Sequence, residues 1–190
     1  MRYLSLFLLI FSSCSPVYIP NLRQSPLFAK PGEMQGAVQV GGGLTSQAAV
    51  ALSNHIGVTS SFMYLKDDLS EAQGEDEFST HRFWEAGLGY FTNKNKHSWE
   101  VYAGFGMGEG SNNDEYYLFD PDPLYVTGKY KRFYIQPALG WNWKIVQLSV
   151  VTRFSFLNMY SFSNNQNSMV ITSNNIDVFF EPAVICRVNL

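Results

Sequence analysis

Three histidines are the side chains of this sequence best suited to acid–base or metal chemistry. They are His55, His81 and His97, and they are far apart in the chain. A lipid-modifying enzyme would need a histidine beside a nucleophilic serine, and His81 with Ser79 is the candidate pair. The sequence has no cysteine pair with zinc-site spacing and no calcium-binding loop motif. We therefore predict no catalytic site, no structural metal site and no cofactor.

Acidic residues are concentrated in two segments. Residues 67–77 and 109–122 hold eleven of the sixteen acidic residues. These carboxylates could bind divalent cations that bridge to anionic lipopolysaccharide, but solvated surface charge is the simpler interpretation. A net charge of −3 gives no basic footprint for nucleic acid. The weak metal candidates are Asp67, Asp68, Asp120 and Asp122.

The first fourteen residues, MRYLSLFLLIFSSC, have the features of a signal peptide. Arg2 supplies the positive charge, and the apolar run after it is too short to span a bilayer as a helix. Small residues before Cys14 are similar to a bacterial lipobox, in which the cysteine is acylated. Simple cleavage nearby is the alternative, and either process predicts export from the cytoplasm.

Residues 15–32 contain four prolines and are predicted to form an extended N-terminal tether. Residues 33–190 then form a single domain. Charged residues are only 15% of the chain and aromatic residues 16%, whereas soluble domains average about 25% charged residues. A surface with so little charge suggests that part of the domain does not face water.

Alternation with a period of two predicts eight strands in this domain. In residues 82–92, for example, Trp84 and Leu88 share one face and Glu85 lies on the other. Each segment is about as long as the ~9–11 residues of a tilted membrane strand. The predicted strands are 34–42, 44–53, 56–65, 82–92, 98–108, 130–143, 145–157 and 176–190.

The connections alternate between short and long from the second predicted strand onward. Tight turns are expected at 54–55, 93–96 and 142–144, and long polar connections at 66–80, 109–128 and 160–175. This alternation is typical of membrane barrels with short periplasmic turns and long external loops. We therefore predict an all-β, eight-stranded antiparallel up-and-down transmembrane β-barrel with both termini in the periplasm.

The face opposite the apolar residues carries six charged side chains, three of each sign. In a barrel this face lines a small lumen, where buried charges must be paired. We predict a polar lumen filled by an ion-pair network, with β-bulges at Pro137 and Pro182. Glycines on this face are expected to make room for the charged side chains. The predicted network is Glu85, Glu100, Arg132, Arg153, Glu181 and Arg187.

Several short motifs support the same conclusion. They are Ser13-Cys14-Ser15-Pro16, Pro31-Gly32-Glu33-Met34-Gln35, Glu85-Ala86-Gly87-Leu88-Gly89-Tyr90 and Phe180-Glu181-Pro182-Ala183. With these motifs the chain resembles a family of small outer-membrane β-barrel proteins and lipoproteins of Gram-negative bacteria, with an outer membrane protein beta-barrel domain. The resemblance implies an outer-membrane barrel and no established activity.

The leading functional hypothesis is a structural or interaction barrel in the outer membrane of a Gram-negative bacterium. Its expected partners are outer-membrane lipid and lipopolysaccharide, and a protein partner is not identified by the sequence. A small pore and a lipid-modifying barrel enzyme are alternatives. A soluble lipocalin-like barrel is a further alternative, and it would need an apolar lumen and a charged exterior.

Overall fold

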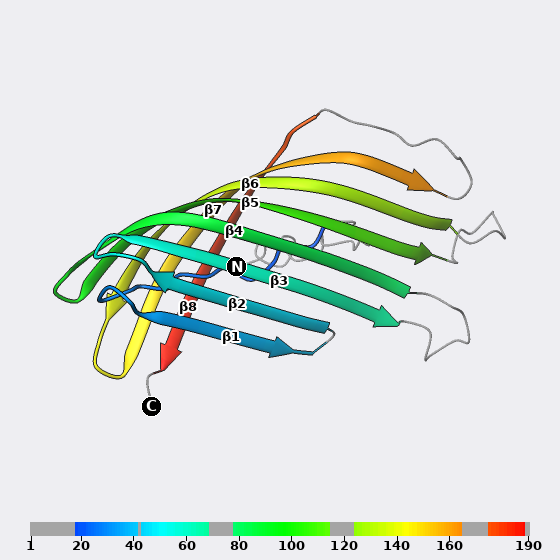
Figure 1. Ribbon diagram of the computed structural model, residues 1–190. Coiled ribbons are helices and arrows are strands. Elements are labelled where there is room, and N and C mark those ends of the chain that lie inside the picture. The colour runs from blue at the N-terminus through cyan, green and yellow to red at the C-terminus, as the bar shows by residue number, and fades with distance from the viewer. Residues whose placement is uncertain (1–17, 42, 69–77, 115–123, 165–174, 189–190) are drawn as a thin grey trace, which may run out of the picture.

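The computed structural model is all-β and describes residues 18–41, 43–68, 78–114, 124–164 and 175–188. Eight strands form one antiparallel sheet, in which each strand pairs with the next along the chain (Figure 1). The described residues include no helix long and apolar enough to cross a membrane. The strands are β1 (Met34–Val40), β2 (Gly43–Ala51), β3 (Ile56–Asp68), β4 (Phe78–Lys94), β5 (His97–Asp114), β6 (Leu124–Asn142), β7 (Val146–Asn164) and β8 (Asp177–Val188).

The predicted up-and-down order is confirmed, but the central strands are longer than predicted. Strands β4 to β7 have 17 to 19 residues, and most of the additional residues lie toward the long connections. There the ladder continues through polar sequence, for example through the pairs Thr80↔Ser111 and Ser79↔Asn112. Polar side chains do not end the ladder because its hydrogen bonds are made by the backbone.

The sheet curls without closing. Figure 1 shows it as a half-barrel, and no pairing joins β1 to β8 in the described part of the chain. This differs from the closed barrel that the sequence predicted. An eight-stranded barrel has room inside for its own side chains only, whereas this sheet wraps around the backbone of residues 18–32 as well. The N-terminal segment thus lies inside the curl of the sheet.

Side chains alternate between the two faces of the sheet as the sequence predicted. Leu88, Phe105 and Val150 are 43–57% exposed on the convex face. Glu85 and Arg153 are 5% and 1% exposed on the concave face. Because the strand period is two, this partition follows from the sequence once the strands are paired.

The prediction of bulges at the two strand prolines is wrong. Pro182 lies on the edge strand β8 and pairs in register with Thr152 of β7. On an edge strand a proline nitrogen can face the open side without the loss of a ladder hydrogen bond. Pro137 pairs with Val101 of β5, and the β6–β7 register is the same on both sides of it. The register shift lies instead at Lys129/Tyr130, near the long connections.

Candidate functional site

Residues 18–32, predicted as a tether, lie along the concave face of the sheet (Figure 1). They form neither helix nor strand. Asn21, Ser25, Leu27 and Phe28 are each at most 2% exposed, so this part of the chain is as buried as a core strand. The segment therefore fills the space that a barrel lumen would occupy.

The segment runs from the long-connection side of the sheet to the short-turn side. Tyr18 packs edge-on against Tyr130, in the half of β6 nearer the long connections. Phe28 packs against Phe91, close to the tight turn between β4 and β5. The segment must end at the short-turn side because β1, which follows it in the chain, begins there, where Met34 pairs with Val50. Tyr18 thus lies far from the short-turn side, where the sequence predicted the N-terminus.

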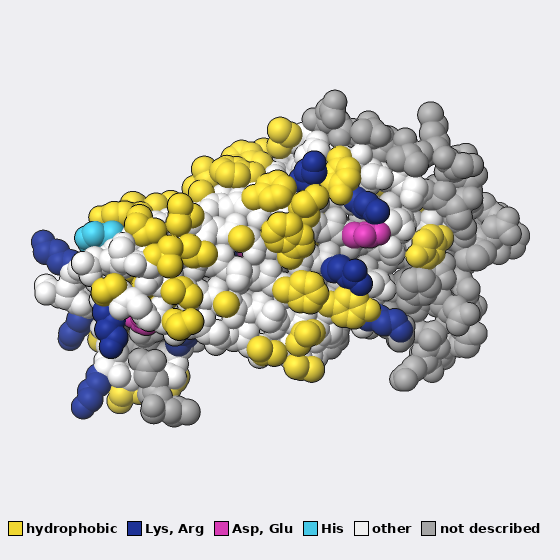
Figure 2. Space-filling model, viewed as in Figure 1, with side chains coloured by type: hydrophobic (Ala, Val, Ile, Leu, Met, Phe, Trp, Pro, Cys, Tyr) yellow, Lys and Arg dark blue, Asp and Glu magenta, His cyan; other side chains and the backbone are white. Residues whose placement is uncertain are grey.

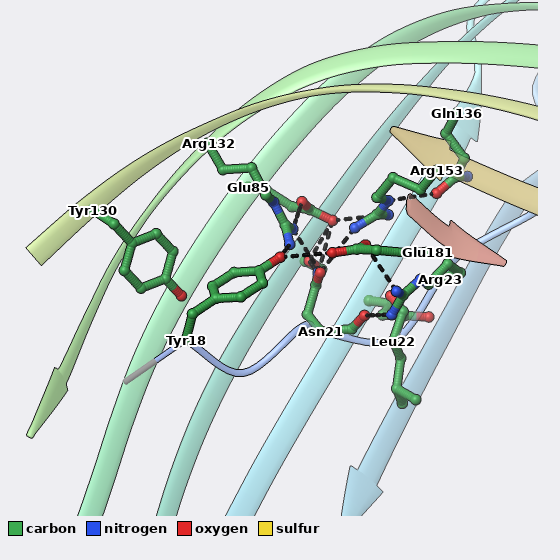
Figure 3. A network of polar contacts seen from close by, with 12 residues as sticks. Tyr18, Asn21, Leu22, Arg23, Glu85, Tyr130, Arg132, Gln136, Arg153 and Glu181 are labelled. Carbon is green, nitrogen blue, oxygen red and sulfur yellow. Dashed lines mark hydrogen bonds and ion pairs between the residues drawn. The ribbon is translucent and has the colours of Figure 1, made fainter. Parts of the chain in front are cut away.

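Asn21 is at the centre of the buried polar cluster (Figure 3). Its Nδ2 donates to Ser61 Oγ at 2.7 Å and to Glu85 Oε1 at 2.7 Å. Its Oδ1 accepts from Arg132 Nη2 at 2.6 Å and from Arg153 Nη1 at 2.9 Å. An amide has two donors and two acceptor lone pairs. All four are used, and they join the segment to β3, β4, β6 and β7 at once.

Glu85 balances two arginines in this cluster. Arg132 contacts Glu85 Oε2 as an ion pair, and Arg153 Nη2 lies 3.3 Å from Glu85 Oε1. Arg153 Nε also donates to Gln136 Oε1 at 2.9 Å, and Gln136 Nε2 donates to the carbonyl oxygen of Gln24 at 2.7 Å. The second arginine is therefore linked to the N-terminal segment through Gln136.

Glu181 binds the same segment from β8. Tyr18 Oη donates to Glu181 Oε1 at 2.9 Å and accepts from Arg132 Nη1 at 2.6 Å. Arg23 Nη2 lies 2.8 Å from Glu181 Oε2, and Arg23 Nη1 donates to the carbonyl oxygen of Asn21 at 2.8 Å. Arg23 was not predicted as a site residue, and it gives the cluster three arginines and two glutamates.

Aromatic rings cover the guanidinium groups, and glycines make room for the rings. The Arg132 guanidinium lies 4.3 Å from the Phe83 ring centre, and that of Arg153 lies 4.5 Å from the Tyr134 ring centre. A Cβ at Gly104 would lie 2.5 Å from the Tyr134 ring. These glycines were expected to accommodate charged groups, but the bulk they accommodate is chiefly that of aromatic rings, which then pack on the cations.

Glu100 and Arg187 were predicted to belong to the same network, but they lie apart from it. Glu100 is fully buried and accepts hydrogen bonds from Ser25 Oγ at 2.5 Å and from the Leu27 amide at 3.1 Å. Among the described residues, no ion pair joins Glu100 to an arginine. Glu100 thus holds the N-terminal segment near the short turns, as Glu85 does farther up.

The remaining candidate residues do not form a second site. His81 Nε2 and Tyr130 Oη are 2.8 Å apart, whereas Ser79 Oγ donates to Asn112 Oδ1 at 2.7 Å. The serine and the histidine therefore have different partners. No group of three metal-ligating residues occurs in the described part of the chain. Of the four metal candidates, Asp67 and Asp68 end β3, while Asp120 and Asp122, like Cys14, lie outside the described residues.

The N-terminal residues of the site were missed because prolines were taken as the sign of a tether. Pro20 and Pro26 do exclude a regular strand or helix there. A better signal was available, because residues 18–30 include four large apolar residues in a short stretch that was expected to be solvated. They are Ile19, Leu22, Leu27 and Phe28. Of these, Leu27 and Phe28 are buried and stabilise the protein, whereas Leu22 is exposed.

Comparisons of the chain with protein-family models, with curated proteins and with solved structures found no match. Chemically, the cluster is a set of hydrogen bonds and ion pairs, in which the Nε atoms of Arg23 and Arg132 are buried without a hydrogen-bond partner. Breaking a buried ion pair by removing one partner costs about 3–5 kcal/mol. The site therefore fixes one position of the N-terminal segment against five strands.

Proposed function

We propose that this protein is an outer-membrane β-barrel of a Gram-negative bacterium, with a structural or interaction role and an interior occupied by its own N-terminal segment. The long connections face the exterior and the short turns face the periplasm. Outer-membrane lipid and lipopolysaccharide are the partners. The chain's similarity to small outer-membrane barrel proteins and lipoproteins, with export directed by residues 1–14, is part of the proposal.

The observation that carries the proposal is the uncharged band on the convex face. On β4, the outward residues between Arg82 and Lys94 are Trp84, Ala86, Leu88, Tyr90 and Thr92. Figure 2 shows hydrophobic side chains spread over this face and charged side chains toward its two ends. Large exposed apolar areas are rare on soluble monomers and mark contact with lipid or a partner.

The height of the band fits a bilayer. Trp84 and Thr92 are eight residues apart, which is about 27 Å along a strand and about 20 Å along the membrane normal at a typical tilt. Arg82 and Lys94 are twelve residues apart, or about 30 Å along the normal by the same reckoning. These two spans bracket the ~25 Å apolar band of outer-membrane barrels. Trp99, paired with Thr92, supplies an interfacial aromatic ring at the short-turn side.

The buried cluster favours an outer-membrane barrel with a filled interior over the alternative functions. A lipocalin-like protein would bury apolar side chains around a ligand and expose charge outside, which is the opposite of the partition seen here. Residues 18–30 occupy the concave face, which favours a closed interior over a conducting one. The different partners of His81 and Ser79 give no support to a lipid-modifying enzyme.

The proposal requires hydrogen-bond partners for the two edge strands of the sheet, β1 and β8. Hydrocarbon does not tolerate unpaired backbone groups, so both edges must be paired in the membrane. Hydrogen exchange on the protein in lipid nanodiscs should therefore find the amides of Met34–Val40 and Asp177–Val188 protected. Fast exchange along both strands, in a sample whose β4–β6 amides are protected, would contradict membrane insertion.

Two arginine substitutions at different depths test the proposal directly. Arginine at the middle of the lipid-facing band costs about 2–4 kcal/mol, and near an interface about 0–1 kcal/mol. Leu88→Arg should therefore lower the unfolding free energy in vesicles by about 2–4 kcal/mol, and Thr92→Arg by less than about 1 kcal/mol. Urea titration with the heat-modifiable gel shift as readout measures both.

A water-soluble protein would respond differently. Leu88 is 57% exposed, so arginine there would meet water and cost little. Equal, small effects of the two substitutions would therefore overturn the proposal. Folding of the protein as a monomer in buffer without lipid or detergent would overturn it as well.

A further inference from the structure

Three cations lie together on the convex face, at the edge of the apolar band on the side of the long connections. In the sheet, Arg82 pairs with Glu109, which pairs with Lys129. Lys131, two residues farther along β6, pairs with Met107 and so lies one step nearer the middle of the band. All four are exposed. Figure 2 shows dark blue side chains gathered around a magenta one at this boundary. We call these four residues with Tyr160 the rim patch, and its formal charge is +2.

The rim patch borders a surface hollow of about 240 Å³. Arg82, Lys129 and Glu109 line it together with Trp84 and Met107. In register, Trp84 pairs with Met107 one step nearer the middle of the band. The hollow is therefore apolar on the band side and cationic on the side of the long connections.

Among the described residues, Glu109 is the acidic side chain that contacts these cations, and the contact is weak. Lys129 Nζ lies 3.9 Å from Glu109 Oε1, at the limit of an ion pair between half-exposed side chains. Arg82 lies over the Tyr64 ring at 5.8 Å, and Lys131 over the Tyr160 ring at 5.0 Å. Such ring contacts orient a cation and leave its N–H donors available for an anion.

The anion that fits this position is a phosphate attached to a lipid. In the proposed orientation the rim patch lies at headgroup depth in the external leaflet, with the acyl chains beside Trp84 and Met107. Arginine binds phosphate with two parallel hydrogen bonds, and lysine binds it as a point charge. We propose that the rim patch binds the phosphate group of a phosphorylated lipid of the external leaflet. This inference rests on the proposed function.

A titration with diphosphoryl lipid A, followed by native mass spectrometry of the detergent-refolded protein, tests the site. Each cation near a membrane anion contributes about 1 kcal/mol, so R82Q/K129Q/K131Q should weaken binding on the order of 100-fold. E109Q removes the carboxylate of the rim patch and should strengthen binding about 3-fold to 5-fold.

The matched control removes three lysines from the opposite rim. Lys94, Lys96 and Lys144 are exposed at the short turns and do not line the hollow. K94Q/K96Q/K144Q makes the same change in net charge and should leave lipid A binding within about 3-fold of the unsubstituted protein. If both triple variants lose binding equally, the effect is one of net charge and the site is overturned.

Two further measurements distinguish failure of the rim patch from failure of the proposed function. Inorganic phosphate should displace lipid A only weakly, and binding of free phosphate as tight as that of lipid A would overturn a lipid site. Every variant is first refolded into vesicles and checked for the heat-modifiable gel shift. A protein that inserts but binds lipid A no better than a dephosphorylated lipid A overturns the rim patch alone. Folding in buffer without lipid overturns the proposed function itself.

Discussion

Replacing Asn21 by leucine removes the amide that joins the N-terminal segment to four strands while keeping a side chain of similar size. Three of its four hydrogen bonds involve charged groups, on Glu85, Arg132 and Arg153. Hydrogen bonds to charged groups contribute about 1.5–3 kcal/mol each.

The lower end of that range applies here because each charged group keeps another partner. Glu85 still contacts both arginines, and Arg153 still donates to Gln136. Three bonds at about 1.5 kcal/mol give an expected loss of about 4 kcal/mol in the free energy of unfolding. Leucine recovers little of this free energy by packing, because its neighbours would be charged groups rather than apolar side chains.

Urea unfolding of the vesicle-inserted protein, followed by tryptophan fluorescence, measures the change. Leu22→Ala is the matched control, because Leu22 is the next residue and is 48% exposed, and it should cost less than about 1 kcal/mol. A double-mutant cycle with Arg153→Leu should give a coupling energy of about 1 kcal/mol or more, since the two residues share a hydrogen bond. If Asn21→Leu and Leu22→Ala unfold at the same urea concentration, the reasoning about the amide is refuted.

Two other substitutions test packing and anchoring in the same assay. Gly104→Ala would place a Cβ 2.4 Å from a backbone oxygen and should cost about 1–3 kcal/mol, whereas Gly36→Ala meets nothing closer than 3.7 Å and should be nearly neutral; equal effects would contradict the steric argument. Glu100→Leu leaves the buried Ser25 hydroxyl and Leu27 amide without their acceptor, and should cost about 1–3 kcal/mol. Faster proteolysis within residues 18–30 should accompany it, and unchanged proteolysis would show that Glu100 does not hold the segment.

The strand pattern and the two faces of the sheet could be predicted from the sequence because alternation is a local property. Glu85 and Leu88 point to opposite faces in any regular strand that contains both. Strand ends were less predictable. Polar residues beyond Arg82 and Met107 looked like loops, but they continue the ladder because their neighbours across the sheet do so too.

The sequence by itself determined the all-β class, the up-and-down order and the identity of the side chains that face inward. Only the tertiary structure decided which partners those side chains have. Arg132 and Arg153 meet Asn21 from more than 100 residues away, a contact that no local pattern encodes. The curl of the sheet was decided at the same level. Inside the curl lies a segment from before the first strand, held by side chains of β3, β4, β6, β7 and β8.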